Sequence, residues 1–278
     1  MNYSQMRFPN FSKKALTFSY DDGVRADKRL IAILDKYGLK GTFNINGNGF
    51  VKEETELKMS KEETINLYKN TMHEVAIHGY THPSLAELDQ AVITHEIIKD
   101  REALEDIFGC VVKGMAYPNG SIDDRVVETL RVCGVEYART IVSTEKFDIP
   151  TDWLRLPATC HHNNPRLMEL AKTFVEAGKA RHYWYDTPML FYVWGHSFEF
   201  DKNNNWNVIE EFAEYIGGRE GIWYATNGEI YEYVKAFERL RFSVTGTFIH
   251  NPSAIDVYFC FRGKNILIPA GKTVSTKE

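Results

Sequence analysis

The chain has 278 residues, of which 44% are hydrophobic and 26% are charged, as in an ordinary soluble globular protein. This length predicts one large domain or two small ones, and it excludes a disordered chain, a collagen-like chain and a small disulfide scaffold. The net charge is -5, from 33 basic and 38 acidic residues, and no basic stripe stands out. Nucleic acid is therefore not an expected partner, whereas a neutral sugar or another uncharged small substrate fits.

The cysteines and the apolar segments indicate a cellular compartment. Cys110, Cys133, Cys160 and Cys260 form no CxxC pair, so we predict reduced and mostly buried thiols. The N-terminal segment MNYSQMRFPNFSKK lacks the apolar stretch of a signal peptide, and the apolar run Met189–Trp194 is too short to span a membrane. We therefore expect a cytoplasmic protein without a membrane partner, although a sequence trimmed of a leader would look the same.

Short β-rich runs alternate with amphipathic helices along most of the chain. The expected strands are residues 15–20, 41–45, 74–77, 111–117, 135–140, 189–194 and 222–225. The expected helices are residues 25–37, 60–70, 87–108, 122–133, 165–178, 206–216 and 228–240. This alternation predicts an α/β fold, and the number of strands favours a distorted parallel (β/α) barrel of about seven strands.

The pattern changes near residue 241, where short β-runs follow one another without helices between them. These runs are RFSVTGTFIHN, IDVYFCFRG and NILIPAG. We therefore predict that residues 1–240 form the barrel and that residues 241–278 form a small β appendage packed on it.

Polar residues follow the carboxyl ends of several expected strands. Asp21–Asp22 follows the first strand, His78 and His82 follow the third, Pro118–Gly120 follows the fourth, and His196 follows a later one. In parallel βα barrels these strand ends meet at one mouth, where function is located. The sequence therefore predicts that these residues converge.

Two imidazoles and one carboxylate form a suitable ligand set for Zn²⁺ or a similar ion, with positions left for water and substrate. His78 and His82 are four residues apart, within reach of one ion. Asp21 and Asp22 are adjacent, so one can bind metal while the other faces the metal-bound water. Taken separately, DDG is also typical of a simple turn and HxxxH of satisfied core or surface histidines. Their joint placement at strand ends favours the metal site.

Four segments carry a resemblance to a known family. TFSYDDG resembles the first motif of the polysaccharide deacetylases, the NodB homology family of carbohydrate esterases (family 4). HEVAIHGYTHP resembles the second motif, in which HxxxH follows a strand and precedes Pro. YPNG resembles the third motif and VWGH the last. The four segments occur in family order across residues 14–200.

The resemblance implies a role for each matched position. Three residues would bind one divalent metal: Asp22, His78 and His82. Zn²⁺ is favoured, with Co²⁺, Mn²⁺, Ni²⁺ or Fe²⁺ as alternatives. Asp21 would be the general base on the metal-bound water, and His196 would be the general acid that protonates the leaving group. The backbone N–H of Asn119 would help to hold the oxyanion.

The chain departs from the family pattern at three places, and the first is the additional aromatic Tyr20 in the first motif. The third motif usually carries an Arg that braces the base, and here that residue is Ala116. Arg139, at the end of the next expected strand, is the candidate substitute, although an ordinary surface Arg is the alternative. Asp152 and Trp153 match the letters of the fourth motif, so Asp152 is the candidate that orients His196, with a long interval between them.

Several side chains are candidates for contact with the substrate. They are Tyr20, Tyr117, Pro118, Trp153, His161 and Trp194. Tyr20 is an additional aromatic residue beside the Asp pair. The dipeptide His161–His162 precedes Pro165, so it belongs to a substrate-lining loop or a helix-capping region, or it forms a second metal site.

The resemblance implies a metal-dependent hydrolase that removes acetyl groups from N- or O-acetylated saccharides. The substrate would be an acetylated sugar or oligosaccharide, and the sequence does not choose between amide and ester. One alternative is hydrolysis of small amides, cyclic imides or ureides on the same scaffold. A second alternative is a catalytically impaired saccharide-binding protein, since the Arg of the third motif is missing. The sequence gives no oligomeric state.

Overall fold

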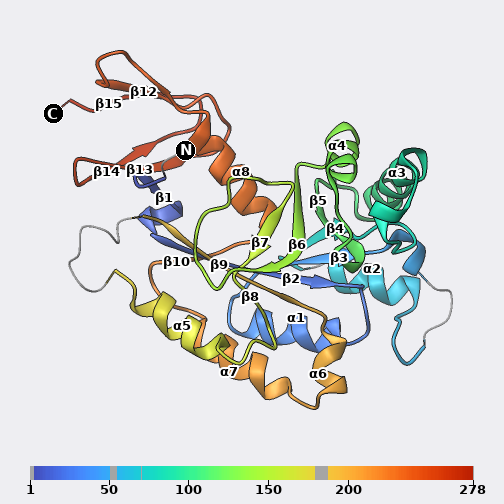
Figure 1. Cartoon of the computed structure of the whole chain (residues 1–278). Coiled ribbons are helices and arrows are strands. Elements are labelled where there is room, and N and C mark those ends of the chain that lie inside the picture. The colour runs from blue at the N-terminus through green and yellow to red at the C-terminus, as the bar shows by residue number, and fades with distance from the viewer. Residues whose placement is uncertain (1–2, 51–54, 70, 179–186, 278) are drawn as a thin grey trace.

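The computed structural model describes residues 3–50, 55–69, 71–178 and 187–277. Its largest element is a parallel sheet at the centre of the molecule (Figure 1). The strands of this sheet are β2 (Lys14–Asp21), β3 (Gly41–Ile45), β4 (Glu74–Ile77), β5 (Gly114–Ala116), β6 (Tyr137–Ser143), β7 (Leu156–Ala158), β8 (Cys160–His161), β9 (Met189–Gly195) and β10 (Ile222–Tyr224).

The hydrogen-bonded path through the sheet is β7-β6-β5-β4-β3-β2-β9-β8, and β10 pairs with β2 beside β3. Both ends of this path lie in one segment, because only Thr159 separates β7 from β8. That segment pairs with β6 at its start and with β9 at its end. The predicted parallel α/β fold is therefore confirmed, although the described strands form no closed barrel.

Helices cover the sheet on its outer faces (Figure 1). They are α1 (Asp27–Lys36), α2 (Lys61–Lys69), α3 (Gln90–Phe108), α4 (Asp124–Val132), α5 (Leu167–Glu176), α6 (Phe198–Lys202), α7 (Trp206–Ile216) and α8 (Asn227–Glu238). α5 packs on α7 and α3 packs on α4, whereas α8 lies between β2 and the C-terminal strands. None of the described helices is both long and apolar enough to cross a membrane.

Alternation along β2 sends its side chains into two different surroundings. Leu16, Phe18 and Tyr20 enter the larger apolar core, where Phe18 meets an aromatic ring of α7. Ser19 and Asp21 point to the opposite face, where polar groups of β3 and β6 contact them. The sheet therefore encloses polar side chains, and the apolar core lies between its strands and the surrounding helices.

The C-terminal residues form two small antiparallel sheets, one of which includes an N-terminal strand. The first has the order β1 (Met6–Arg7), β13 (Val257–Phe261) and β14 (Lys264–Ile268). The second has the order β11 (Arg241–Phe242), β12 (Phe248–His250) and β15 (Thr273–Ser275). Tyr233 of α8 donates a hydrogen bond to the backbone oxygen of Arg7 and accepts one from Tyr258, so α8 ties these strands to the main sheet.

Three details differ from the sequence predictions. The expected strand at 111–117 is reduced to Gly114–Ala116, and at its carboxyl end it stops before the tight turn of Pro118–Gly120. The four cysteines are free thiols, and only Cys133 and Cys160 are buried, while Cys110 is exposed. Strands β7 and β8 and helix α6 were not predicted, since each is five residues or shorter.

Gly114→Ala is expected to destabilise the fold because β5 and β6 approach closely at this position. A Cβ atom at Gly114 would lie 2.1 Å from Oη of the buried Tyr137, so the ring would have to move. Overpacking of this kind costs about 1–3 kcal/mol of unfolding free energy. Gly49→Ala is the matched control, since its Cβ would have no neighbour closer than 3.7 Å. Equal urea midpoints for the two variants would contradict the prediction.

Candidate active site

The carboxylates of Asp21 and Asp22 diverge at the end of β2. Asp21 is 3% exposed and points into the polar interior of the sheet. The next residue, Asp22, has φ 80 and donates its backbone N–H to the oxygen of Asn44, so the chain turns sharply here. A positive φ in a residue other than Gly is a strained conformation that is concentrated at functional sites. Because of this turn, the carboxylate of Asp21 points into the sheet, whereas that of Asp22 points in another direction.

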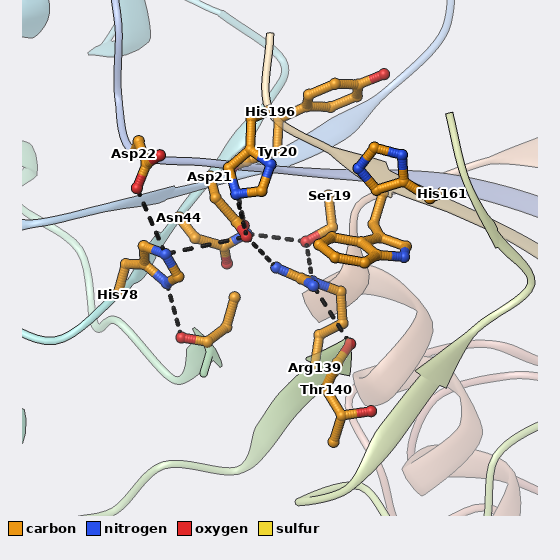
Figure 2. A network of polar contacts seen from close by, with 12 residues as sticks. Ser19, Tyr20, Asp21, Asp22, Asn44, His78, Arg139, Thr140, His161 and His196 are labelled. Carbon is orange, nitrogen blue, oxygen red and sulfur yellow. Dashed lines mark hydrogen bonds and ion pairs between the residues drawn. The ribbon is translucent and has the colours of Figure 1, made fainter. Parts of the chain in front are cut away.

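Asp22 meets two histidines that follow β4. Its Oδ1 lies 3.6 Å from Nε2 of His78 and 3.5 Å from Nε2 of His82. One ligand atom from each of these three residues lies within 4.8 Å of the others. The structure therefore brings together the three residues predicted as metal ligands, and Figure 2 shows the ring of His78 between Asp22 and Asp21.

His78 is held in the orientation that a metal ligand needs. Its Nδ1 lies 2.8 Å from the backbone oxygen of Ala116, which can only accept, so Nδ1 carries the proton and Nε2 keeps its lone pair. Nε2 is buried and has no hydrogen-bond partner among the described residues. Burial lowers the pKa of His78, which keeps the ring neutral. An unpartnered buried nitrogen facing a carboxylate and a second imidazole fits a divalent ion of the zinc type.

Asp100 supports His78 from α3. Its Oδ2 accepts the backbone N–H of His78 at 2.9 Å, and its Oδ1 accepts the N–H of Gly47 at 2.6 Å. Burial raises the pKa of Asp100 to about 7, although these N–H donors lower it. The carboxyl group thus fixes the end of β4 relative to the loop that follows β3.

Arg139 of β6 contacts Asp21 inside the sheet, as Figure 2 shows. Its Nη2 donates to Oδ2 of Asp21, and its Nε donates to Oγ of Ser19 at 3.2 Å. Arg139 is paired in register with Ala116, so its guanidinium comes from the neighbouring strand at the level of the residue where the sequence lacks the expected Arg. Arg139 is 1% exposed and is therefore not an ordinary surface residue.

The contacts of Asp21 keep it ionised. Burial raises the pKa of Asp21, but Arg139, His78 and His196 outweigh burial and lower the pKa below its ordinary value. Asn44 donates to Oδ1 of Asp21 at 2.8 Å. Asp21 is thus a fixed carboxylate beside the three-residue metal-ligand cluster.

His196 stands on the other side of Asp21. β9 ends at Gly195, and Nε2 of His196 lies 3.8 Å from Oδ2 of Asp21. Nδ1 of the same ring lies 3.2 Å from Oε1 of Glu199 on α6. Burial lowers the pKa of His196, but the bond to Glu199 and the nearby aspartates outweigh it and raise the pKa. Sequence reasoning missed Glu199, although the His-x-x-Glu spacing after a strand was a usable signal.

The structure does not bring Asp152 and Trp153 to this site, so their prediction was wrong. The side chain of Asp152 is 51% exposed and pairs with Arg155 at 3.0 Å. Trp153 is buried in the second apolar core, where its ring packs on Tyr231 of α8. Asp152 and Trp153 lie just before β7, and their described contacts are with Arg155 and with α8 and not with His196.

Three of the predicted substrate contacts are core residues instead. Tyr20 is 1% exposed and its ring packs at a tilt against Phe200 of α6, because Tyr20 alternates with Asp21 and points to the helices. Tyr117 is also 1% exposed and donates its hydroxyl to the oxygen of Leu154. Pro118 is buried. These side chains support the site from behind and do not face a substrate.

The other predicted substrate residues lie beside His196 or at the rim. The ring of Trp194 is 4.6 Å from that of His161 and 6.0 Å from that of His196, and it covers the guanidinium of Arg139 at 4.4 Å. Asn119 is exposed, has φ 56, and places its side-chain nitrogen 3.5 Å from the backbone oxygen of His82. The turn of the third motif thus meets that of the second.

A cavity of about 760 Å³ lies beyond Val24 and Phe198, outside the residues described so far. Its wall includes Val24, which follows the Asp pair, and Phe198, whose ring lies 5.4 Å from that of His196. Leu57 and Trp206 add apolar surface, and Arg25 adds charge. Five more charged side chains line this cavity, and they are Lys28, Arg29, Glu56, Asp201 and Lys202. None of the predicted metal-binding or catalytic residues lines it, so the cavity is a neighbour of the site and not part of it.

Part of the chain matches the sequence model of a known protein family. Residues 9–138 match the sequence model of the family described as polysaccharide deacetylase. A chitin deacetylase from Pestalotiopsis sp is 29% identical over 154 residues, which cover 54% of this chain and 48% of that protein. The match spans less than half the length of this chitin deacetylase, and the same holds for two further curated relatives.

Solved structures share the fold at low sequence identity. A Mycobacterium smegmatis protein assigned to the polysaccharide deacetylases has a TM-score of 0.62 and 18% identity, and the match covers 86% of this chain and 96% of that one. A family 4 carbohydrate esterase pseudoenzyme from Bacillus anthracis has a TM-score of 0.50 and 18% identity, with 82% and 68% covered. At such identities the likeness concerns the fold alone.

Proposed function

Because residues 9–138 belong to the polysaccharide deacetylase family, we propose that this chain is a metal-dependent hydrolase that removes acetyl groups from an N- or O-acetylated saccharide. The observation that carries the proposal is the joint geometry of two groups. A cluster of one carboxylate and two imidazoles lies beside a buried, Arg-paired Asp21. A hydrolase of this type needs both a metal position and a separate base.

We assign the metal to Asp22, His78 and His82, with Zn²⁺ as the favoured ion because the donor set is two nitrogens and one oxygen. A divalent ion held there would lower the pKa of a water molecule and polarise the acyl carbonyl. Asp21 would accept the proton of the attacking water, for which its carboxylate is ionised and fixed. Arg139 would keep that carboxylate in place.

The leaving group would be protonated from the side of the site where His196 lies. His196 would donate a proton from Nε2, the ring nitrogen that faces Asp21, to the departing amine or alcohol. The backbone N–H of Asn119 would contribute to oxyanion binding from the turn of the third motif. His161 and Trp194 would line the acyl or sugar position.

The catalytically impaired alternative depended on the missing Arg of the third motif. The contact of Arg139 with Asp21 argues against it, since a guanidinium reaches the base from the adjacent strand. Hydrolysis of cyclic imides or ureides would use the same ligand cluster, and only an assay separates it from deacetylation.

The deciding experiment is acetate release from chitooligosaccharides and acetylated xylooligosaccharides by the Zn²⁺-loaded protein. We expect acetate from at least one of them, loss of activity on chelation and recovery when Zn²⁺ is restored. Ring opening of a cyclic imide without acetate from either saccharide would replace the proposal with the imide alternative. Saccharide binding without turnover of any of the three would favour the impaired alternative.

His82→Ala is expected to weaken Zn²⁺ binding by about a hundredfold or more, because it removes one of three ligands. Its side chain is 36% exposed, so the substitution leaves no large buried cavity. His95→Ala, which removes an exposed histidine on α3, is the matched control and should bind Zn²⁺ like the parent. Bound metal is measured by elemental analysis after dialysis. Stoichiometric metal in His82→Ala would exclude this ligand set.

A further inference from the structure

We propose that Glu199 is the positioning residue of His196, and that His161, His162 and Asn163 hold its carboxylate for this purpose. The proposal rests on the proposed deacetylase function, in which His196 donates the proton. Glu199 lies in the first turn of α6, which begins three residues after β9. The short helix α6 thus places the carboxylate of Glu199 beside His196, the residue that follows β9.

The two oxygens of Glu199 have separate partners. Oε1 lies 3.2 Å from Nδ1 of His196. Oε2 lies 3.1 Å from Nε2 of His162 and 3.3 Å from Nε2 of His161, and it accepts the amide of Asn163 at 2.9 Å. Oε2 is therefore held by one hydrogen bond, from Asn163, and by contacts with two imidazole rings, while Oε1 faces the imidazole of His196.

The two imidazole neighbours of Glu199 contact it without adding positive charge. Burial lowers the pKa of His161 to about 4 and also lowers the pKa of His162, so both rings are neutral near pH 7. Burial raises the pKa of Glu199, but the bonds from His162 and His196 outweigh it and lower the pKa. Glu199 is thus an anion, and His196 is the ring beside it that gains most from carrying a proton.

The arrangement defines which proton moves. Nδ1–H of His196 donates to Glu199, so Nε2 is the nitrogen that faces Asp21 and the reacting centre. When the carbon–nitrogen or carbon–oxygen bond breaks, its electron pair goes to the leaving atom, which takes the proton from Nε2. The ring of His196 becomes neutral, and the proton on Nδ1 stays where it is.

A second metal ion is the competing interpretation, because ligand atoms of His161, His196 and Glu199 lie within 4.8 Å of one another. The hydrogen bonds favour the positioning role. Asn163 can only donate to Oε2 through its amide nitrogen, and an ion bound at Nδ1 of His196 would remove the proton that orients this ring. The test therefore includes a count of bound metal.

The experiment compares Glu199→Gln with the parent on an N-acetyl saccharide and on nitrophenyl acetate. Oε2 accepts the amide of Asn163, so we expect the side-chain oxygen of the Glu199→Gln variant at that position. The amide nitrogen of this variant then faces Nδ1 of His196 and cannot accept its proton. We expect kcat/KM for the amide to fall about a hundredfold. The nitrophenyl ester should change by less than about threefold, since its leaving group departs without a proton. His196→Ala should show the same split.

Asp201→Asn is the matched control, since it removes the same charge from the same helix and its partner is Trp206. It should change neither rate. A proton NMR signal for the hydrogen-bonded Nδ1–H of His196 should be present in the parent and in Asp201→Asn and absent in Glu199→Gln. This signal tests the positioning even if the parent releases no acetate, which would count against the proposed function alone.

Three results would overturn the assignment. The first is an equal loss of amide and ester hydrolysis in Glu199→Gln, or no loss of either. The second is an unchanged Nδ1–H signal in that variant. The third is two metal ions bound to the parent and one to Glu199→Gln, which would make the cluster a second metal site.

Discussion

Asp21→Asn is expected to lower kcat/KM for acetate release by about a hundredfold or more, the usual size of a general-base contribution. The amide has nearly the shape of the carboxylate but cannot accept the proton of the attacking water. Asp21 is a neighbour of the ligand cluster and not one of its three members, so bound Zn²⁺ should remain. The measurement is acetate release together with elemental analysis of the same preparation.

Asp22→Asn is the comparison that separates base from ligand. The two aspartates are adjacent, but the φ of 80 at Asp22 turns its carboxylate toward His78 and His82. Asp22→Asn should therefore lose metal affinity and activity together, whereas Asp21→Asn should lose activity alone. An Asp21→Asn variant with parental turnover would mean that the two aspartates have exchanged roles.

Much of the fold follows from sequence periodicity. The strands 41–45 and 74–77 and the helix 206–216 were predicted with the bounds that the structure has, because turn residues flank short β-rich runs and an amphipathic helix. β7, β8 and α6 were not predictable in this way, since two to five residues carry no measurable period. Because α6 carries Glu199 and β8 ends at His161, the contacts of these residues with His196 were not predicted from the sequence either.

The site was predictable where it depended on strand ends and not where it depended on short loops. Asp22, His78 and His82 follow the ends of strands that lie close in the sheet, so their convergence required only the order of elements. Arg139 was accessible to the same reasoning, since it lies on the strand after Ala116. The prediction for Asp152 was wrong because matching letters do not say which neighbour a loop side chain reaches, and here that neighbour is Arg155. The prediction for Tyr20 was wrong because strand alternation turns it away from Asp21.

The second large effect concerns stability and the buried pair of Asp21 and Arg139. Arg139→Met leaves the Asp21 carboxylate buried without its cation and is expected to cost about 3–5 kcal/mol of unfolding free energy. Asp21→Asn leaves Arg139 buried without an anion and should also destabilise. The double variant removes both charges, so its loss should be smaller than the sum of the two single losses by more than about 1 kcal/mol.

Two design choices isolate the pair in this cycle. All four proteins are unfolded in urea with a chelator present, so differences in metal binding do not enter. Arg139 also lies over the ring of Trp194, and this contact is lost in both variants that carry the Arg139→Met substitution, so it cancels in the cycle. Strictly additive losses would mean that the pair contributes nothing beyond its separate parts.

The pH dependence gives the same pair an independent signature. Burial raises the pKa of Asp21, but Arg139, His78 and His196 hold it below the ordinary 3.8 in the folded parent. Stability from this group is therefore fully present above pH 3.8 and is lost as pH falls through the folded pKa. In Arg139→Met the buried carboxyl should instead take up a proton more readily, so the deficit relative to the parent should be largest near pH 8 and shrink toward pH 4. A deficit that stays constant across this range would show that Arg139 stabilises the fold by packing and not through its charge.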